Sequence, residues 1–208
     1  MRDYSLKPSI TIVAGKSGSG KTTFCYRYLV NAQNVLCRFV FDPKGEAPER
    51  LGIAPAETAE ELELALADGF VVYHPGHMFS GHPEVGFAYF CNWVLSVSER
   101  VRGRKLFLVD EVWKYCNPHT IPDCLATCCQ DGRSRGIEMI FATQRPNRLN
   151  ESITNEATEI ILFRLNGSRA IAWAEEFGYD PDEVLTIAPG AFVALNCDSG
   201  GESRGKVF

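Results

Sequence analysis

The segment that most constrains the fold of this chain is a glycine-rich loop placed directly after a short apolar run. The run is Ile10-Thr11-Ile12-Val13, and the sequence then reads Ala14-Gly15-Lys16-Ser17-Gly18-Ser19-Gly20-Lys21-Thr22-Thr23. Its spacing matches G-x-x-x-x-G-K-[ST], which is typical of a loop between a buried strand and a helix. Glycine permits backbone conformations in which successive N–H groups point into one concave surface. The sequence therefore predicts a strand, an anion-binding loop and a helix in direct succession.

The residue types in this loop (Walker A) indicate that the anion is a nucleotide phosphate. Backbone N–H groups and the N-terminus of the following helix bind phosphate oxygens. We expect Lys21 to lie against the β- and γ-phosphates and the Thr22 hydroxyl to take one position on Mg²⁺. An ordinary glycine-rich turn is the disfavoured alternative. The residues assigned to ATP are Gly15, Lys16, Ser17, Gly18, Ser19, Gly20, Lys21, Thr22 and Thr23.

The length of 208 residues fits one α/β domain, because a chain of this size buries a full core but not a second large one. We expect a P-loop ATPase domain over residues 1–198 and a flexible tail over residues 199–208, where glycine and serine are frequent. No apolar run approaches the roughly 18 to 20 residues that cross a bilayer, and the first residues lack a signal-peptide core. These features predict an intracellular protein without a transmembrane segment.

Apolar, β-branched runs alternate with helical segments, which is typical of a mostly parallel sheet flanked by helices. The fold class expected is therefore α/β, a single-domain P-loop NTPase of the RecA-like (ASCE) type. The predicted strands cover residues 10–14, 35–41, 70–74, 106–110, 138–143, 159–165 and 191–196. The predicted helices cover residues 21–32, 58–66, 85–102, 122–130, 151–155 and 168–177.

A second nucleotide motif (Walker B) is indicated by the apolar run 106–109, which ends in Asp110 and Glu111. Asp110 is expected to hold Mg²⁺ through its water shell. Glu111 is expected to polarise the water that attacks the γ-phosphate. A strand end with two acids is common in many folds, so its value here comes from the phosphate loop upstream.

Two further groups complete the predicted catalytic set. Gln144 closes the next apolar strand, and its amide can sense the γ-phosphate or orient water because it both donates and accepts hydrogen bonds. Arg133 and Arg135 lie in a predicted turn just before that strand. An arginine there can reach the nucleotide of a neighbouring subunit and neutralise charge that develops in the transition state. The alternative is that both arginines belong to a solvated turn.

Charge and cysteine content limit the possible partners. The formal net charge of −5 argues against a monomer coated in positive charge for nucleic acid, but not against a ring with a basic lining. Residues 133–169 carry six arginines against four glutamates, so positive charge is concentrated there. Four of the eight cysteines fall within residues 116–129 without C-x₂-C spacing. This spacing favours reduced thiols that pack between helices over a metal site.

The order of these parts resembles a known family. The segment from Gly132 to Pro146 reads GRSRGIEMIFATQRP and is similar to the part of FtsK-type DNA translocases that runs from a G-R turn to A-T-Q-R-P. The motor domain of the HerA/FtsK superfamily also has an acidic D-E pair upstream and a glutamine closing the next strand. The Asp42-Pro43-Lys44 turn resembles the D-P-K turn of many members. The resemblance spans residues 10–195.

This resemblance implies an ATP-driven motor that assembles as a ring, usually a hexamer, and threads double-stranded DNA through its centre. In such a ring Arg133 or Arg135 acts on the ATP of the adjacent subunit, and we favour Arg133. Contacts to DNA are then mostly to phosphates and independent of sequence. The candidates for DNA contact are Arg145, Asn147 and Arg148.

The chain resembles only some members of the family, because we expect it to lack the membrane spans, winged-helix module and N-terminal β-barrel that other members carry. A bare motor core of this length is similar to the genome-packaging ATPases of membrane-containing icosahedral DNA viruses. This implies a capsid or portal-vertex partner, and a location in the host cytoplasm with incorporation at a virion vertex. Three alternatives stay open: a plasmid or chromosomal translocase, a nucleotide switch in assembly, and a small-molecule kinase.

Overall fold

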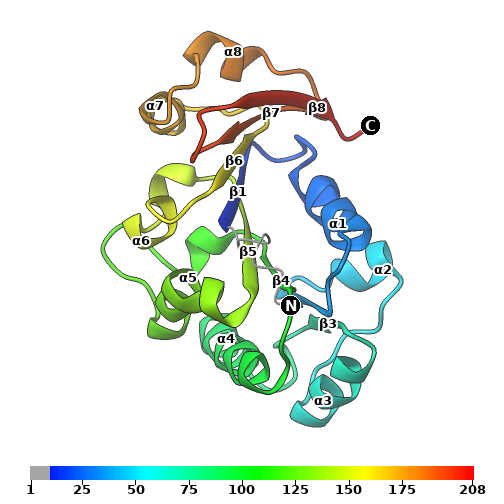
Figure 1. Cartoon of the computed structure of the whole chain (residues 1–208). Helices are drawn as coiled ribbons and strands as arrows, with labels where there is room; N and C mark the ends of the chain where they lie inside the picture. Colours follow the sequence, from blue (N-terminus) through cyan, green and yellow to red (C-terminus); the bar gives the residue numbers. More distant parts are fainter. Residues whose placement is uncertain (1–9) are drawn as a thin grey trace.

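The computed structural model describes residues 10–208, which form one eight-stranded sheet with helices on both faces (Figure 1). The strands are β1 (Ile10–Ala14), β2 (Cys37–Phe41), β3 (Phe70–Tyr73), β4 (Lys105–Val109), β5 (Ile137–Thr143), β6 (Glu159–Leu162), β7 (Ala191–Asn196) and β8 (Glu202–Lys206). Their order across the sheet is β3-β2-β4-β5-β1-β6-β7-β8. Strands β1 to β6 pair in parallel, whereas the β6–β7 and β7–β8 pairs are antiparallel. The expected α/β class with a mostly parallel sheet is confirmed.

Helices cover both faces because successive strand residues point to opposite sides of the sheet. The α-helices are α1 (Lys21–Asn31), α2 (Ala47–Leu51), α3 (Ala59–Ala67), α4 (Pro83–Arg100), α5 (Asp123–Arg135), α6 (Glu151–Thr154), α7 (Ser168–Glu176) and α8 (Pro181–Thr186). Two 3₁₀ turns, η1 (Val112–Lys114) and η2 (Pro146–Arg148), follow β4 and β5. Phe39 and Phe107 share a core with α4 and α5, while Val40 and Leu108 share the other core with α1. Figure 1 shows α1 on one side of the sheet and α4 and α5 on the other.

The topology brings three strand ends to one edge of the sheet. Strand β5 lies between β1 and β4, with Ala14 beside Thr143 and Val109 beside Phe141. Because all three strands run in the same direction, the loops that follow them start side by side. Ligand crevices of open α/β sheets lie at this carboxyl edge. The phosphate loop, the acidic pair and Gln144 are therefore neighbours as a consequence of strand order.

All predicted strands and helices are present, and only α5 ends more than three residues from its predicted boundary. Helix α5 continues to Arg135 and is closed by Gly136 in the left-handed conformation, with φ 70°. The turn predicted for residues 132–136 is thus corrected to the last turn of a helix. Short helices α2 and α8 were not predicted.

The flexible tail predicted over residues 199–208 is also corrected. Residues 202–206 form β8 and pair with β7 in register, from Ala191 with Lys206 to Leu195 with Glu202. Val207 is 4% exposed, and its backbone N–H donates to the carbonyl of Gly190 at 2.8 Å. The end of β8 is consequently fixed against the loop that leads into β7.

The described helices and cysteines bear on membrane spans and on metal sites. Within residues 10–208, none of the helices combines the length and apolarity needed to cross a membrane. Seven cysteines are buried and free, and Cys91 of α4 lies 3.8 Å from Cys128 of α5 between their Sγ atoms. The described part of the chain contains no group of three histidine, cysteine or acidic side chains able to hold a metal ion.

Candidate functional site

The phosphate loop depends on glycine at two positions for different reasons. A Cβ on Gly15 would lie 2.6 Å from Phe163 Cβ and 2.8 Å from Ser19 Oγ, so the loop packs too closely for a side chain there. Gly20 has φ 111° and immediately precedes α1. Residues with a side chain rarely adopt this conformation. The glycines thus turn the chain from β1 into α1 with the first backbone N–H groups of the helix facing the loop.

The polar groups of the loop fit a polyphosphate. Lys21 is 5% exposed and its Nζ donates to the Lys16 carbonyl at 3.0 Å. Burial lowers the pKa of Lys21, while the nearby carboxylates of Glu111 and Asp110 oppose that shift. Ser19 Oγ is buried and has no hydrogen-bond partner among residues 10–208. A buried donor without a partner is costly, and a phosphate oxygen would satisfy it.

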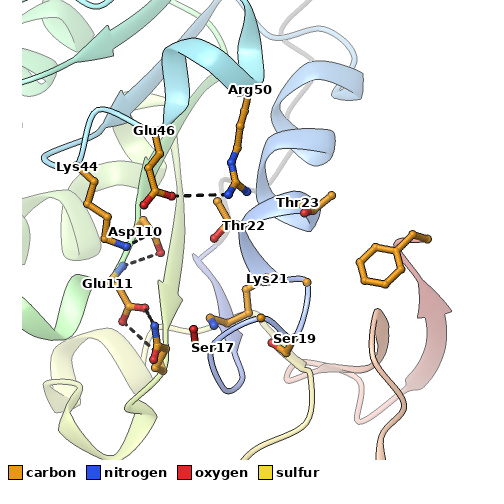
Figure 2. Close-up of a pocket in the computed structure, with 14 residues that line it drawn as sticks. Ser17, Ser19, Lys21, Thr22, Thr23, Lys44, Glu46, Arg50, Asp110 and Glu111 are labelled. Carbon is orange, nitrogen blue, oxygen red and sulfur yellow. Dashed lines mark hydrogen bonds and ion pairs between the residues drawn. The ribbon is translucent and has the colours of Figure 1, made fainter.

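Asp110 lies across the cavity from this loop, at the end of β4 (Figure 2). Its Oδ1 accepts a hydrogen bond from the Glu111 backbone at 2.9 Å, and its Oδ2 lies 3.8 Å from Lys44 Nζ. Burial raises the pKa of Asp110, and the Lys44 ammonium counteracts this rise. Figure 2 shows Thr22 on α1 facing the same cavity. A hydroxyl and a carboxylate on opposite walls are oxygen ligands of the kind that Mg²⁺ prefers.

Glu111 is held by three hydrogen-bond donors. Its Oε2 accepts from the Trp113 indole N–H and, at 3.2 Å, from the Gln144 backbone N–H. Its Oε1 accepts from the Gln144 side-chain amide. Glu111 is 5% exposed and adopts the left-handed conformation with φ 51°. Glu111 and Gln144, which the sequence predicted separately as catalytic residues, are therefore in direct contact.

These groups line one cavity of about 280 Å³. Its lining consists of Ser17, Gly18, Ser19, Gly20, Lys21, Thr22, Thr23, Lys44, Glu46, Arg50, Asp110, Glu111, Gln144 and Phe208. Gly15 and Lys16 do not line it, because Gly15 packs against Phe163 and Lys16 contributes its carbonyl to Lys21. Their assignment to ATP thus lacks direct support from the cavity.

Sequence reasoning missed four residues of the lining. Lys44 belongs to the Asp42-Pro43-Lys44 turn after β2, which was noted but not assigned to the site. Glu46 precedes α2 and forms an ion pair at 3.8 Å with Arg50, which lies in the last turn of this helix. Phe208 follows β8, and no sequence signal placed it near the phosphate loop.

The Phe208 ring lies beside the phosphate loop at the rim of the cavity. A Cβ on Gly190 would come within 2.6 Å of this ring, and one on Gly20 within 3.6 Å. Phe208 is 70% exposed although it belongs to a folded segment. Its position is set by Val207, whose carbonyl also accepts a hydrogen bond from the Arg27 guanidinium. An exposed aromatic face at a polar cavity is a surface on which a base can stack.

The two arginines predicted to act on a neighbouring subunit lie far from this cavity. Arg133 and Arg135 belong to the last turn of α5, which leads into the opposite end of β5. Seven residues of strand separate the two ends, or about 20 Å at the usual rise. Arg133 is exposed, whereas Arg135 is partly buried and pairs with Glu99 at 3.0 Å. Neither can reach the cavity of its own chain.

The residues predicted to contact DNA lie next to the cavity. Arg145 directly follows Gln144 and precedes η2, Arg148 is the last residue of η2, and both side chains are exposed. Their guanidinium carbons lie 4.6 and 5.5 Å from the centroid of the Trp113 ring. Asn147 is half-buried between them. The structure thus gathers the two arginines around one aromatic side chain.

The fold and the phosphate loop together define a P-loop NTPase domain. Solved structures of this architecture include the genome packaging NTPase B204 from Sulfolobus turreted icosahedral virus 2, in complex with ATP-gammaS. That protein is 16% identical, with a TM-score of 0.76 over 97% of this chain and 98% of that chain. B204, the DNA-packaging ATPase from Sulfolobus turreted icosahedral virus, is 18% identical, with a TM-score of 0.77 over 97% of this chain and 98% of that chain. VirB4 of Thermoanaerobacter pseudethanolicus is 12% identical, with a TM-score of 0.71 over 100% of this chain and 91% of that chain.

These likenesses concern the fold. No protein-family model matches the chain, and no curated protein matches it. The expected similarity to viral packaging ATPases is confirmed at the level of the fold. B204 was solved with ATP-gammaS, AMPPCP and AMP, so that protein binds nucleotides on the same architecture.

Proposed function

We propose that this chain is an ATP-hydrolysing translocase for double-stranded DNA that works as a ring and packages a viral genome into a preformed capsid. The observation that carries the proposal is the arrangement after β5, where Gln144 contacts Glu111 and the next residue, Arg145, belongs to an exposed arginine pair. An ATP site and a surface for phosphates thus share one loop. Similarity to B204 over nearly the whole of both chains supports the packaging setting.

The residues of the cavity divide the work of hydrolysis between its two walls. Lys21 and the backbone of the phosphate loop bind the β- and γ-phosphates and balance their charge. Glu111 accepts a proton from the attacking water, and Gln144 orients that water or the γ-phosphate. The bond between the γ-phosphorus and the bridging oxygen breaks as the water oxygen attaches, which yields ADP and phosphate.

The cavity also supports a role for Mg²⁺. Thr22 would bind the ion directly and Asp110 through water, and the ion would neutralise charge on the β- and γ-phosphates when bound. Lys44, with its Nζ 3.8 Å from Asp110 Oδ2, opposes the rise in the pKa of this carboxyl that burial causes.

A ring accounts for two arginines that lie far from the cavity of their own chain. Arg133, exposed on the last turn of α5, is our choice for the group that acts on the ATP of an adjacent subunit, and Arg135 is the alternative. We expect a homo-oligomer, in the first instance a hexamer, with capsid or portal-vertex proteins as docking partners. The corresponding location is the host cytoplasm and a vertex of the virion.

The runner-up is a translocase that moves plasmid or chromosomal DNA. Its chemistry is the same, and the likeness to VirB4 is a likeness of fold. A non-translocating nucleotide switch in assembly is a third reading, in which hydrolysis is slow and independent of DNA. These readings differ in their response to DNA, which makes that response the decisive measurement.

The test is steady-state ATP hydrolysis at several protein concentrations, with and without long double-stranded DNA of mixed sequence, together with the mass in solution. We expect turnover to rise with assembly and again with DNA. Replacing both Arg145 and Arg148 by glutamine is expected to weaken DNA binding by about tenfold or more. The slope of log K against log salt concentration should become shallower by about one unit per lost phosphate contact. DNA affinity is measured by fluorescence anisotropy across a salt series.

A charge-matched control is the pair Arg100→Gln and Arg204→Gln, which removes two exposed guanidinium groups that pair with Glu63 and Glu183 away from the cavity. We expect this control to bind DNA nearly as the wild type does. An equal loss of DNA affinity in both double variants would show that the effect comes from net charge alone. Slow hydrolysis that ignores DNA in an assembled ring would refute the translocase and favour the nucleotide switch.

A further prediction concerns Phe208, which we expect to stack against the adenine base. Replacing Phe208 with alanine should raise KM for ATP by about tenfold with little change in kcat, because stacking on an aromatic ring contributes about 1–3 kcal/mol and is equal before and in the transition state. Steady-state kinetics measure both constants. Phe208→Tyr should restore KM, and Val30→Ala, an exposed apolar residue of α1 outside the cavity, serves as control. An unchanged KM in Phe208→Ala would exclude stacking.

A further inference from the structure

The contacts of Trp113 join the catalytic carboxylate to the exposed arginines. Its indole N–H donates to Glu111 Oε2, and its ring face carries the guanidinium groups of Arg145 and Arg148. One side chain thus touches Glu111 with its polar edge and two cations with its π-face. The proposed mechanism assigns work to Glu111 and to the arginines, but none to the residue between them.

The backbone around Trp113 holds this arrangement in a strained form. Glu111 is one of two non-glycine residues with a positive φ in the described part of the chain. Its left-handed conformation starts η1 and brings Trp113, two residues later, back against the Glu111 carboxylate. Conformations of this kind cost energy and persist where the surroundings enforce them, which is common at catalytic and switching positions.

Both carboxylate oxygens of Glu111 accept hydrogen bonds from other groups of the protein. Oε2 accepts from the indole N–H and from the Gln144 backbone, and Oε1 accepts from the Gln144 amide. A carboxylate must face the attacking water to accept its proton. The contact with Trp113 therefore competes with that role and restrains the carboxylate.

The arginines are arranged to respond to a polyanion. Within residues 10–208, neither Arg145 nor Arg148 forms an ion pair with a carboxylate, and both side chains are exposed. Both guanidinium groups lie over the Trp113 ring, which attracts them through a cation–π interaction. A cation over an indole ring also makes its N–H a better donor, because it withdraws electron density. A phosphate that binds the guanidinium groups competes with the ring for them.

We propose that Trp113 is a positioning residue that couples DNA binding at Arg145 and Arg148 to the release of the Glu111 carboxylate for catalysis. Without DNA, the arginines sit on the ring and the indole N–H restrains Glu111. When DNA phosphates draw the guanidinium groups away, the indole becomes a weaker donor and Glu111 turns to the attacking water. The inference rests on the proposed function, since it needs a DNA-stimulated ATPase.

The test is Trp113→Phe, which keeps an aromatic face for the arginines and removes the N–H donor together with the five-membered ring that carries it. We expect hydrolysis without DNA to rise by about tenfold, the value of one hydrogen bond to a charged group. Stimulation by DNA should fall to nearly one, while DNA affinity stays within about twofold because the ring is retained. A merely structural role for Trp113 would lower both rates together and leave their ratio unchanged.

The chain offers a matched control. Trp93 also donates its indole N–H to a glutamate, Glu63 at 2.9 Å, but on α4 away from the cavity. Trp93→Phe removes the same kind of hydrogen bond and is expected to keep both the basal rate and the DNA stimulation. Thermal unfolding of both variants shows whether their folds are equally retained.

A second measurement leaves Trp113 in place and covers the case in which Trp113→Phe fails to fold. The chain has three tryptophans, so a variant with Trp93→Phe and Trp173→Phe keeps Trp113 as its single tryptophan fluorophore. Its emission should shift when DNA binds, because two cations leave its ring. An unchanged emission at saturating DNA would overturn the coupling, as would an unchanged stimulation ratio in Trp113→Phe. Failure of the wild type to respond to DNA would instead overturn the proposed function itself.

Discussion

Replacing Lys21 with alanine is expected to weaken ATP binding by about a hundredfold and to abolish detectable hydrolysis. A hydrogen bond from a charged donor contributes up to about 3 kcal/mol, and no other side chain of the phosphate loop carries an ammonium into the cavity. The lysine is 5% exposed and lies close to Asp110 and Glu111, so its removal also leaves two carboxylates facing the phosphates. Titration calorimetry with a non-hydrolysable ATP analogue measures the affinity.

The fold is expected to survive this change. Lys21 is desolvated and its Nζ donates to the Lys16 carbonyl, a contact within the loop itself. The matched control is Lys16→Ala, since this second lysine of the loop does not line the cavity. Its effect should be much smaller than that of Lys21→Ala. Normal turnover in Lys21→Ala would exclude the phosphate-loop assignment, and equal losses in the two variants would indicate a general disturbance of the loop.

The parts of the fold that sequence predicted correctly are those written in local patterns. Buried strands such as β4 and β5 are continuous apolar runs, and their parallel pairing follows from the helices between them. The phosphate loop and the acidic pair were predictable because each is a short motif of a few residue types at fixed spacing directly after an apolar strand. The contact between Gln144 and Glu111 follows from the observed strand order, which was not predicted from the sequence.

The features that sequence did not reveal depend on contacts between distant segments. Strand β8 carries charged and small residues and has the composition of a tail, but its backbone pairs with β7. Gly205 lies against the Phe192 ring, so closely that a Cβ would come within 2.4 Å of it. Such a cross-strand approach leaves no periodic signal. The same holds for Phe208 at the cavity and for Trp113 between Glu111 and the arginines.

Replacing Glu111 with glutamine is expected to preserve ATP binding and to lower kcat by about 10²- to 10⁴-fold, the usual contribution of a general base. The site can accommodate the change. The remaining oxygen can accept from the Trp113 indole and the Gln144 backbone, as Oε2 does now. The new amide then faces the Gln144 side chain, whose own amide can rotate to present its oxygen. Loss of binding in this variant would make Glu111 a structural residue, and normal turnover would exclude it as the base.

The same variant tests whether an arginine acts between subunits. In rings mixed from equal amounts of Glu111→Gln and Arg133→Ala chains, an intact site needs the glutamate of one chain and the arginine of its neighbour. If chains mix at random, about a quarter of the interfaces meet both conditions, so about a quarter of wild-type turnover should return although each variant alone is inactive. Measuring ATP hydrolysis against mixing ratio gives a maximum near equal amounts.

The control mixture combines Glu111→Gln with Lys21→Ala, because both changes damage the site of their own chain. No interface in this mixture has an intact site, so no recovery is expected at any ratio. Arg135→Ala in place of Arg133→Ala decides between the two arginines, since only the residue that reaches the neighbouring nucleotide gives recovery. Arg135 already pairs with Glu99, whereas Arg133 is exposed at the end of α5, which favours Arg133 as the residue that shows recovery. Absence of recovery with either arginine would leave the ring without a shared site and would contradict action in trans.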